Sequence, residues 1–123
     1  MEEFRNAKKL AGFIGKIALE KKGSNIIILD VRKISSMVDF FVMITGLGEK
    51  HSKAIADDIV DTLNKKGMRK WHLEGYSYGH WILIDYVDVV VHIFVEEERK
   101  FYDLESLWGD APMEKIGEVD AKH

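Results

Sequence analysis

The chain has 123 residues, of which 46% are hydrophobic and 32% charged, and this is the composition of one globular domain with its own core. A net charge of −3 argues against binding dominated by nucleic-acid phosphates, although it is compatible with a local basic patch. The absence of cysteine excludes disulfides, thiolate catalysis and cysteine-based zinc sites.

Targeting signals are not recognisable in the sequence. The longest apolar runs are far shorter than the roughly 20 residues that a membrane-spanning helix needs. The first residues, acidic and then basic, lack the apolar core of a secretory signal or the pattern of a transit peptide. We therefore expect a cytoplasmic protein that has no membrane partner.

The chain is expected to begin with a helix and two strands. Apolar residues at three- and four-residue spacing predict an amphipathic helix over 3–22, which Gly23 ends in a left-handed conformation. The apolar run 26–31 predicts a strand buried on both faces. Aromatic and branched residues predict a second strand over 39–45.

A turn at Gly46-Leu47-Gly48 leads into a second amphipathic helix over 49–66, which ends at Gly67. The run 69–74 mixes charged and apolar residues and predicts a weak strand near a sheet edge.

The two strongest strands are expected at 81–86 and 89–95, and their short connection predicts an antiparallel hairpin. The charged residues 96–100 indicate a solvated break, and 104–108 a short helix. Beyond Ala111 we expect a frayed tail.

These elements predict a single α/β domain in which helices pack on a mixed five-stranded sheet. The strand–helix–strand order over 39–74 indicates one parallel crossover. The expected domain spans 1–111, and 112–123 form a flexible C-terminal tail.

Two features allow an enzymatic interpretation. Gly46 and Gly48 lie between a strand and a helix, where backbone N–H groups can hold a phosphate. Asp85 and Asp88 flank the hairpin turn and could bind Mg²⁺ or act as an acid–base pair. However, a full phosphate-loop motif is absent, and aspartates commonly stabilise tight turns. A plain turn is favoured at both places.

The five histidines are scattered, and no dense set of ligands predicts a metal site. Alternation places His92 on one strand face with Val90 and Phe94, so we expect a buried neutral imidazole bonded to backbone or to a carboxylate.

Aromatic residues gather around the predicted hairpin at Tyr76, Tyr78, Trp81 and Tyr86. Some of these rings must belong to the core, and partly exposed ones would be typical anchors of a protein interface. For Trp81 both roles remain open. Arg99 could lie beside a binding surface or pair with Asp103.

Four blocks of the sequence resemble the ribosomal silencing factor family, also called Iojap. They read SSMVDFFVMITG, HSKAIADDI, EGYSYGHWILIDYVDVVVHIF and EERKFYDLESLW, in order over about residues 35–108. The resemblance implies a nucleotidyltransferase-like core without the catalytic set, and a non-enzymatic translational repressor with no cofactor. It implies docking on ribosomal protein L-fourteen of the large ribosomal subunit, which blocks joining of the small subunit when nutrients are short.

Carried over by motif, the expected partner contacts are Trp81, Tyr86, Tyr102, Leu104 and Arg99. The family usually has glycine where this chain has Val87, which either alters the hairpin turn or adds an apolar contact. Two other interpretations stay open. One is a nucleotide-binding or nucleotidyl-transferring enzyme that uses the glycines and aspartates named above, and the other is a homodimeric adaptor built on the aromatic residues.

Overall fold

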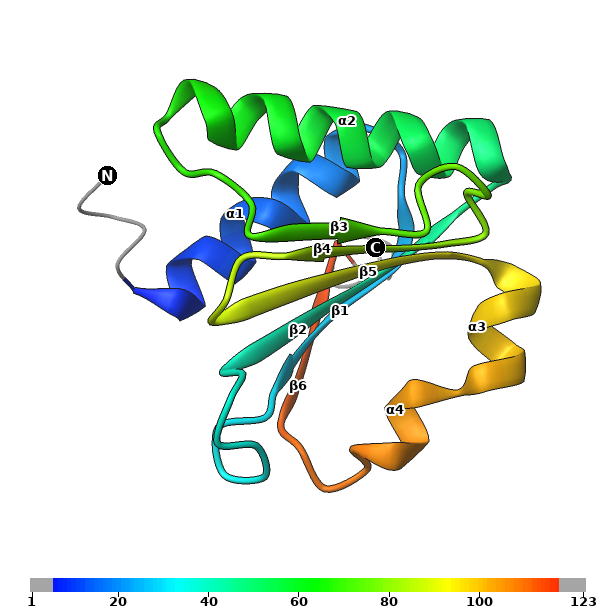
Figure 1. Ribbon diagram of the computed structural model, residues 1–123. Coiled ribbons are helices and arrows are strands. Elements are labelled where there is room, and N and C mark those ends of the chain that lie inside the picture. The colour runs from blue at the N-terminus through cyan, green and yellow to red at the C-terminus, as the bar shows by residue number, and fades with distance from the viewer. Residues whose placement is uncertain (1–5, 118–123) are drawn as a thin grey trace.

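A computed structural model describes residues 6–117, and the expected elements follow in the expected order with two additions (Figure 1). The strands and helices are β1 Ser24–Asp30, β2 Phe40–Gly46, β3 His72–Glu74, β4 Trp81–Asp85, β5 Val89–Val95, β6 Met113–Ile116, α1 Ala7–Glu20, α2 Glu49–Lys65, α3 Glu96–Tyr102 and α4 Leu104–Leu107. The additions are β6 and α3. The first residues of the helix expected over 3–22 lie outside the described range.

The strands form one mixed sheet in the order β3-β4-β5-β2-β1-β6. The pairing of β4 with β5 is antiparallel, as the hairpin predicts, and β5 pairs parallel with β2. The crossover through α2 carries the chain from β2 to the far edge of the sheet. There β3 runs in the same direction as β2, with β4 and β5 between them. The prediction of a single α/β domain with a mixed sheet is confirmed.

The number of strands was predicted wrongly, because the sheet has six and not five. The sixth strand, β6, lies within the segment 112–123 that was expected to fray, and it pairs antiparallel with β1 from Ile26↔Ile116 to Leu29↔Met113. Backbone N–H and C=O groups along β1 need partners, and β6 supplies them at that edge. The rest of the expected tail, 118–123, lies outside the described residues.

The charged break expected at 96–100 is instead the helix α3. Three glutamates occupy its first turn, and Arg99 and Lys100 lie in its last turn. This order of charge complements the helix dipole at both ends. The charges that mark a solvated segment therefore also stabilise a short helix.

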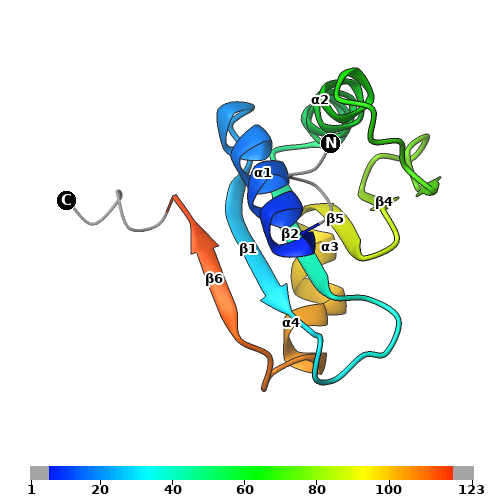
Figure 2. The ribbon, with the colours of Figure 1, turned by 90° about the vertical axis from the view of Figure 1, so that its left-hand side faces the viewer.

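The sheet separates two layers of helices (Figures 1 and 2). Helices α1 and α2 cover one face, and α3 and α4 lie against the other. The larger core cluster lies under α1 and α2 and includes Ile14, Ile55, Ile82 and Ile93, all fully buried. No helix within residues 6–117 is long and apolar enough to cross a membrane.

The end of α1 differs in detail from the expectation. The left-handed residue is Lys22, with φ of 69°, and not Gly23. Gly23 is needed for a close approach instead, because a Cβ there would lie 3.0 Å from both the carbonyl oxygen of Ala18 and Cγ2 of Ile44.

The β4–β5 hairpin turns at Val87, which has φ of 77° although its side chain is branched at Cβ. Its N–H donates to Oδ1 of Asp85 at 2.7 Å, and its side chain is exposed. When the first residue alone of a two-residue hairpin loop has a positive φ, that residue is normally glycine. The turn therefore keeps its geometry at a cost in backbone strain.

We expect Val87→Gly to raise the free energy of unfolding by about 1 kcal/mol, because a left-handed conformation costs an L-residue roughly 1–2 kcal/mol. Val87→Ala, which keeps the Cβ, should give a smaller gain. Urea denaturation of the three proteins measures the difference. Destabilisation by the glycine would mean that the valine side chain makes a contact that outweighs the strain.

Candidate functional site

The sheet face that α3 and α4 cover only in part is the candidate site, and we call it the open face. Register places Trp81 opposite Phe94 and Leu83 opposite His92, so all four side chains point to this face. Trp81 and Leu83 are half-buried, whereas His92 and Phe94 are buried beneath their neighbours.

Ring contacts join the aromatic residues of this face into a continuous series. Phe101 meets Tyr102 at 5.0 Å between ring centroids, Tyr102 meets Trp81 at 4.7 Å, and Trp81 stacks on Phe94 at 5.1 Å. Further along, the Phe41 ring lies 5.2 Å from His92 and 5.3 Å from Trp108. Five of these rings keep an exposed or half-exposed surface, and we call them the aromatic patch: Phe41, Trp81, Phe101, Tyr102 and Trp108.

The patch has a depression and an apolar border. A shallow hollow beside Trp81 is lined by Glu74, Gly75 and Leu83. On the other side α4 presents Leu107, which is 73% exposed, next to the half-buried Leu104. Exposed apolar area with a hollow and a large aromatic ring is the usual anatomy of a protein-binding surface.

His92 fixes the orientation of Trp81. The Trp81 indole N–H donates to Nδ1 of His92 at 3.1 Å, so the imidazole is neutral and carries its proton on Nε2. Burial lowers the pKa of His92 to about 4, which keeps this acceptor available at neutral pH. The expected buried neutral histidine is confirmed, but its partner is an indole and not backbone or a carboxylate.

Arg99 holds α3 and α4 against the sheet. Its guanidinium is 5% exposed and donates from Nη1 to the carbonyl oxygen of Asn25 at 2.7 Å and to Oγ1 of Thr45 at 2.8 Å. Its Nη2 and Nε bind the Glu105 carboxylate, the former at 2.9 Å. One side chain thus ties α4 to β2 and to the start of β1.

The structure brings together three of the five expected contact residues. Trp81, Tyr102 and Leu104 lie on the open face. Tyr86 is buried on the opposite face, in the core beneath α1 and α2, and burial raises the pKa of its hydroxyl. Arg99 is buried and pairs with Glu105, not with Asp103. Tyr86 and Arg99 are only 6% and 5% exposed. Tyr86 faces the core because it alternates along the chain with Ile82 and Ile84, which are buried on the same side.

Sequence reasoning missed several members of the surface. Phe41 is predicted only as part of a strand and Leu107 only as part of the short helix over 104–108, and Phe101 falls between that helix and the charged break at 96–100. The signal was present in the spacing of residues 101–108, where apolar side chains stay together once a helix forms.

Two of the features that allowed an enzymatic interpretation, Asp85 and the turn at 46–48, serve local structure. Asp85 accepts the N–H of Val87 in the hairpin turn, as turn chemistry predicts. The Leu47 N–H donates to Nδ1 of His51 at 2.9 Å, and Nε2 of His51 bonds the carbonyl oxygen of Lys21 at 2.7 Å. The turn at 46–48 is therefore braced against the end of α1.

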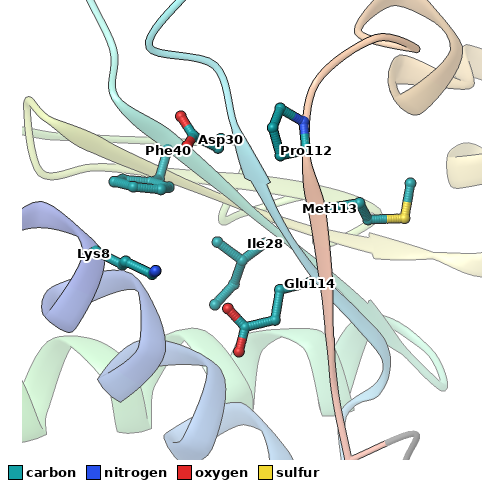
Figure 3. Close-up of a pocket in the computed structure, with 7 residues that line it drawn as sticks. All are labelled: Lys8, Ile28, Asp30, Phe40, Pro112, Met113 and Glu114. Carbon is teal, nitrogen blue, oxygen red and sulfur yellow. The ribbon is translucent and has the colours of Figure 1, made fainter.

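A second hollow is lined by residues of α1, β1, β2 and β6, and none of its lining residues belongs to the aromatic patch (Figure 3). Lys8 and Glu114 point toward it from α1 and β6, and Ile28, Phe40 and Pro112 complete its apolar wall. The carboxylate of Asp30 at its rim already accepts hydrogen bonds from Arg32, the shortest at 2.6 Å. These bonds lower the pKa of that carboxyl to about 2. This mixture of charges defines no single class of ligand.

We expect Arg99→Ala to lower the free energy of unfolding by about 3 kcal/mol, because it leaves Glu105 and Thr45 without their buried partner. Lys100→Ala is the matched control, since Lys100 is exposed and its ion pair with Glu96 is 3.5 Å long, and it should change stability by less than about 0.5 kcal/mol. Equal effects in urea denaturation would show that the buried contacts of Arg99 contribute little.

The stability of the protein should fall between pH 7 and pH 4 because of His92. In the unfolded chain His92 has its ordinary pKa of 6.5, and in the folded protein its pKa is lowered to about 4. In that window only the unfolded chain binds the proton, so stability is lost as pH falls, by up to about 3 kcal/mol at pH 4.

His92→Gln removes this titration. The difference in unfolding free energy between the native protein and the variant should therefore shrink as pH falls from 7 to 4. A difference that stays constant with pH would mean that folded His92 protonates freely.

Comparison with known proteins identifies the fold and the family together. A crystal structure of a protein from Chromobacterium violaceum superposes with a TM-score of 0.82 at 32% identity, and the match covers 85% of this chain and 87% of that one. The ribosomal silencing factor of Halalkalibacterium halodurans is 43% identical over 93 residues, which are 76% of this chain and 80% of the relative. That of Bacillus subtilis is 37% identical over 108 residues, which are 88% and 92% of the two chains.

The family model described as "Ribosomal silencing factor during starvation" matches residues 5–123, nearly the whole sequence. Proteins of this family regulate translation and are not enzymes. With the family model, the curated relatives and the fold in agreement, this chain belongs to the ribosomal silencing factor family.

Proposed function

We propose that this chain represses translation by docking on ribosomal protein L-fourteen of the large ribosomal subunit, so that the small subunit cannot join. The observation that carries the proposal is the aromatic patch on the open face. Its rings lie on helices and strands, and contacts from Phe101 through Tyr102 to Trp81 form a connected aromatic surface beside a hollow able to receive a partner side chain. Family membership directs the proposal to the ribosome.

The mechanism is occlusion. A docked domain excludes the small subunit by its volume, and no bond is made or broken. Docking requires a total buried area on the order of 1,200–2,000 Å², with a few large side chains at its centre. Trp81 suits the central position, because its N–H is already bonded to His92 and its ring rests on Phe94, so little conformational freedom is lost on binding.

Tyr102 and Leu104 are the next contacts that we propose, and Phe101 and Leu107 add apolar area at the border, since they are 80% and 73% exposed. The trigger that we propose is nutrient limitation, and the place of action is the bacterial cytoplasm. The description of the family model supports the trigger, and the bacterial relatives support the place of action.

We expect Trp81→Ala to weaken binding to purified large subunits by about 30-fold, equivalent to about 2 kcal/mol. Co-sedimentation measures the affinity, with small subunits as the negative control. Leu19→Ala is the matched variant, because Leu19 is an exposed apolar residue of α1, on the opposite face.

Circular dichroism must first show that the Trp81 variant folds. Full affinity in a folded Trp81→Ala protein would remove the patch as the docking surface. Binding of the native protein to neither subunit would reject the proposed function altogether. Loss of a concentration-dependent dimer in the variant, with subunit binding unchanged, would assign the patch to self-association.

A further inference from the structure

A second surface lies at the end of the molecule opposite α3. Helix α2 ends there, and the chain turns through residues 66–71 toward β3 (Figure 1). Lys65, Lys66, Arg69 and Lys70 stand within six residues, followed directly by Trp71. We call residues 65–71 the basic end. No acidic residue occurs between positions 62 and 73, although the net charge of the chain is −3.

Within residues 6–117, no carboxylate pairs with the cations of the basic end. Lys66 lies 5.6 Å from the centre of the Phe13 ring, which leaves its positive charge in place. Lys65 and Lys66 also complement the dipole at the end of α2, but that role does not extend to Arg69 and Lys70.

Trp71 is the stronger observation, because its side chain is 75% exposed. Its backbone is fixed, since its N–H donates to the carbonyl oxygen of Asp85 at 2.7 Å. The loop before it is also ordered by hydrogen bonds, from the N–H groups of Gly67 and Met68 to Asn64 and Leu63. A large flat ring is thus held in water by an ordered backbone, at the end of a segment that carries four cations.

Flexible phosphate backbones bind to grooves or edges of positive charge, and unstacked bases stack on exposed aromatic rings. We propose that the basic end binds single-stranded or looped RNA, with the four cations on phosphates and a base stacked on Trp71. This inference rests on the proposed function in one respect: ribosomal RNA near the docking site would be the physiological ligand. The binding itself can be measured without ribosomes.

The first test is fluorescence anisotropy of the full chain with a labelled 12-nucleotide uridine RNA over a series of salt concentrations. We expect a weak dissociation constant, about 10⁻⁴–10⁻⁶ M near physiological salt, and a slope of log affinity against log salt of about −3, because each of four neutralised phosphates contributes roughly −0.7. Trp71→Ala should reduce the affinity about tenfold, and Trp71→Phe should retain most of it.

Two triple variants remove equal charge from different places. In the first variant alanine replaces Lys65, Arg69 and Lys70, and the slope of log affinity against log salt should become flatter by about two. The control variant has alanine in place of Lys8, Lys9 and Lys16 on α1, and it should keep most of the salt slope. The inference is overturned if the two triple variants lose equal affinity, or if Trp71→Ala binds the RNA as well as the native protein does.

Sedimentation of the same proteins without RNA tests whether a second copy of the chain binds the basic end instead. A dimer that Trp71→Ala dissociates, with no change in RNA affinity, would assign the basic end to a second copy of the chain and overturn the RNA assignment. Failure here is separable from failure of the proposed function, because Trp81→Ala tests docking on the large subunit and leaves the basic end intact. RNA binding without subunit binding would reject docking alone.

Discussion

The buried guanidinium of Arg99 is the interaction on which the open face depends. Helices α3 and α4 are too short to be stable in isolation, so their position comes from contacts with the sheet. Arg99 satisfies a carbonyl group at Asn25, a hydroxyl on β2 and the Glu105 carboxylate with one rigid group. A lysine could not replace this geometry. The charge that looks like a surface feature in the sequence is a structural cross-link, and it holds the helix that carries the rings of Phe101 and Tyr102 against the sheet.

The two faces of the sheet have different roles, one in the core and one at the surface. One face is closed by α1 and α2 and supplies most of the core. The other is closed only in part, by α3, α4 and the segment around Ala111, and its rings remain accessible. Because β5 is buried along its whole length, the hairpin that carries Trp81 rests on a rigid central strand. A docking surface on such a frame loses little entropy on binding.

Periodicity predicted the helices, the hairpin and the mixed sheet because each carries a strong local pattern. Alternation from the short turn even places Trp81 and His92 on one face, although their hydrogen bond was not anticipated.

The errors have physical causes. Strand β6 has little apolar pattern and exists because β1 offers it an edge, and α3 was hidden by charges that stabilise its ends. Tyr86 lies in the core with Ile82 and Ile84, because a match to a motif does not tell which face of a strand a side chain takes. The exposure of Trp71 depends on tertiary structure and has no sequence signal.

The hydrogen bond from Arg99 to Asn25 joins residues 74 positions apart. A contact of such long range forms only when nearly the whole chain is in place, since the entropy of closing so large a loop must first be offset by the rest of the core. Assembly of the aromatic patch is therefore tied to global folding. A nascent or partly unfolded copy has the residues of the aromatic patch but not the assembled surface, so any binding that depends on the patch is confined to intact molecules.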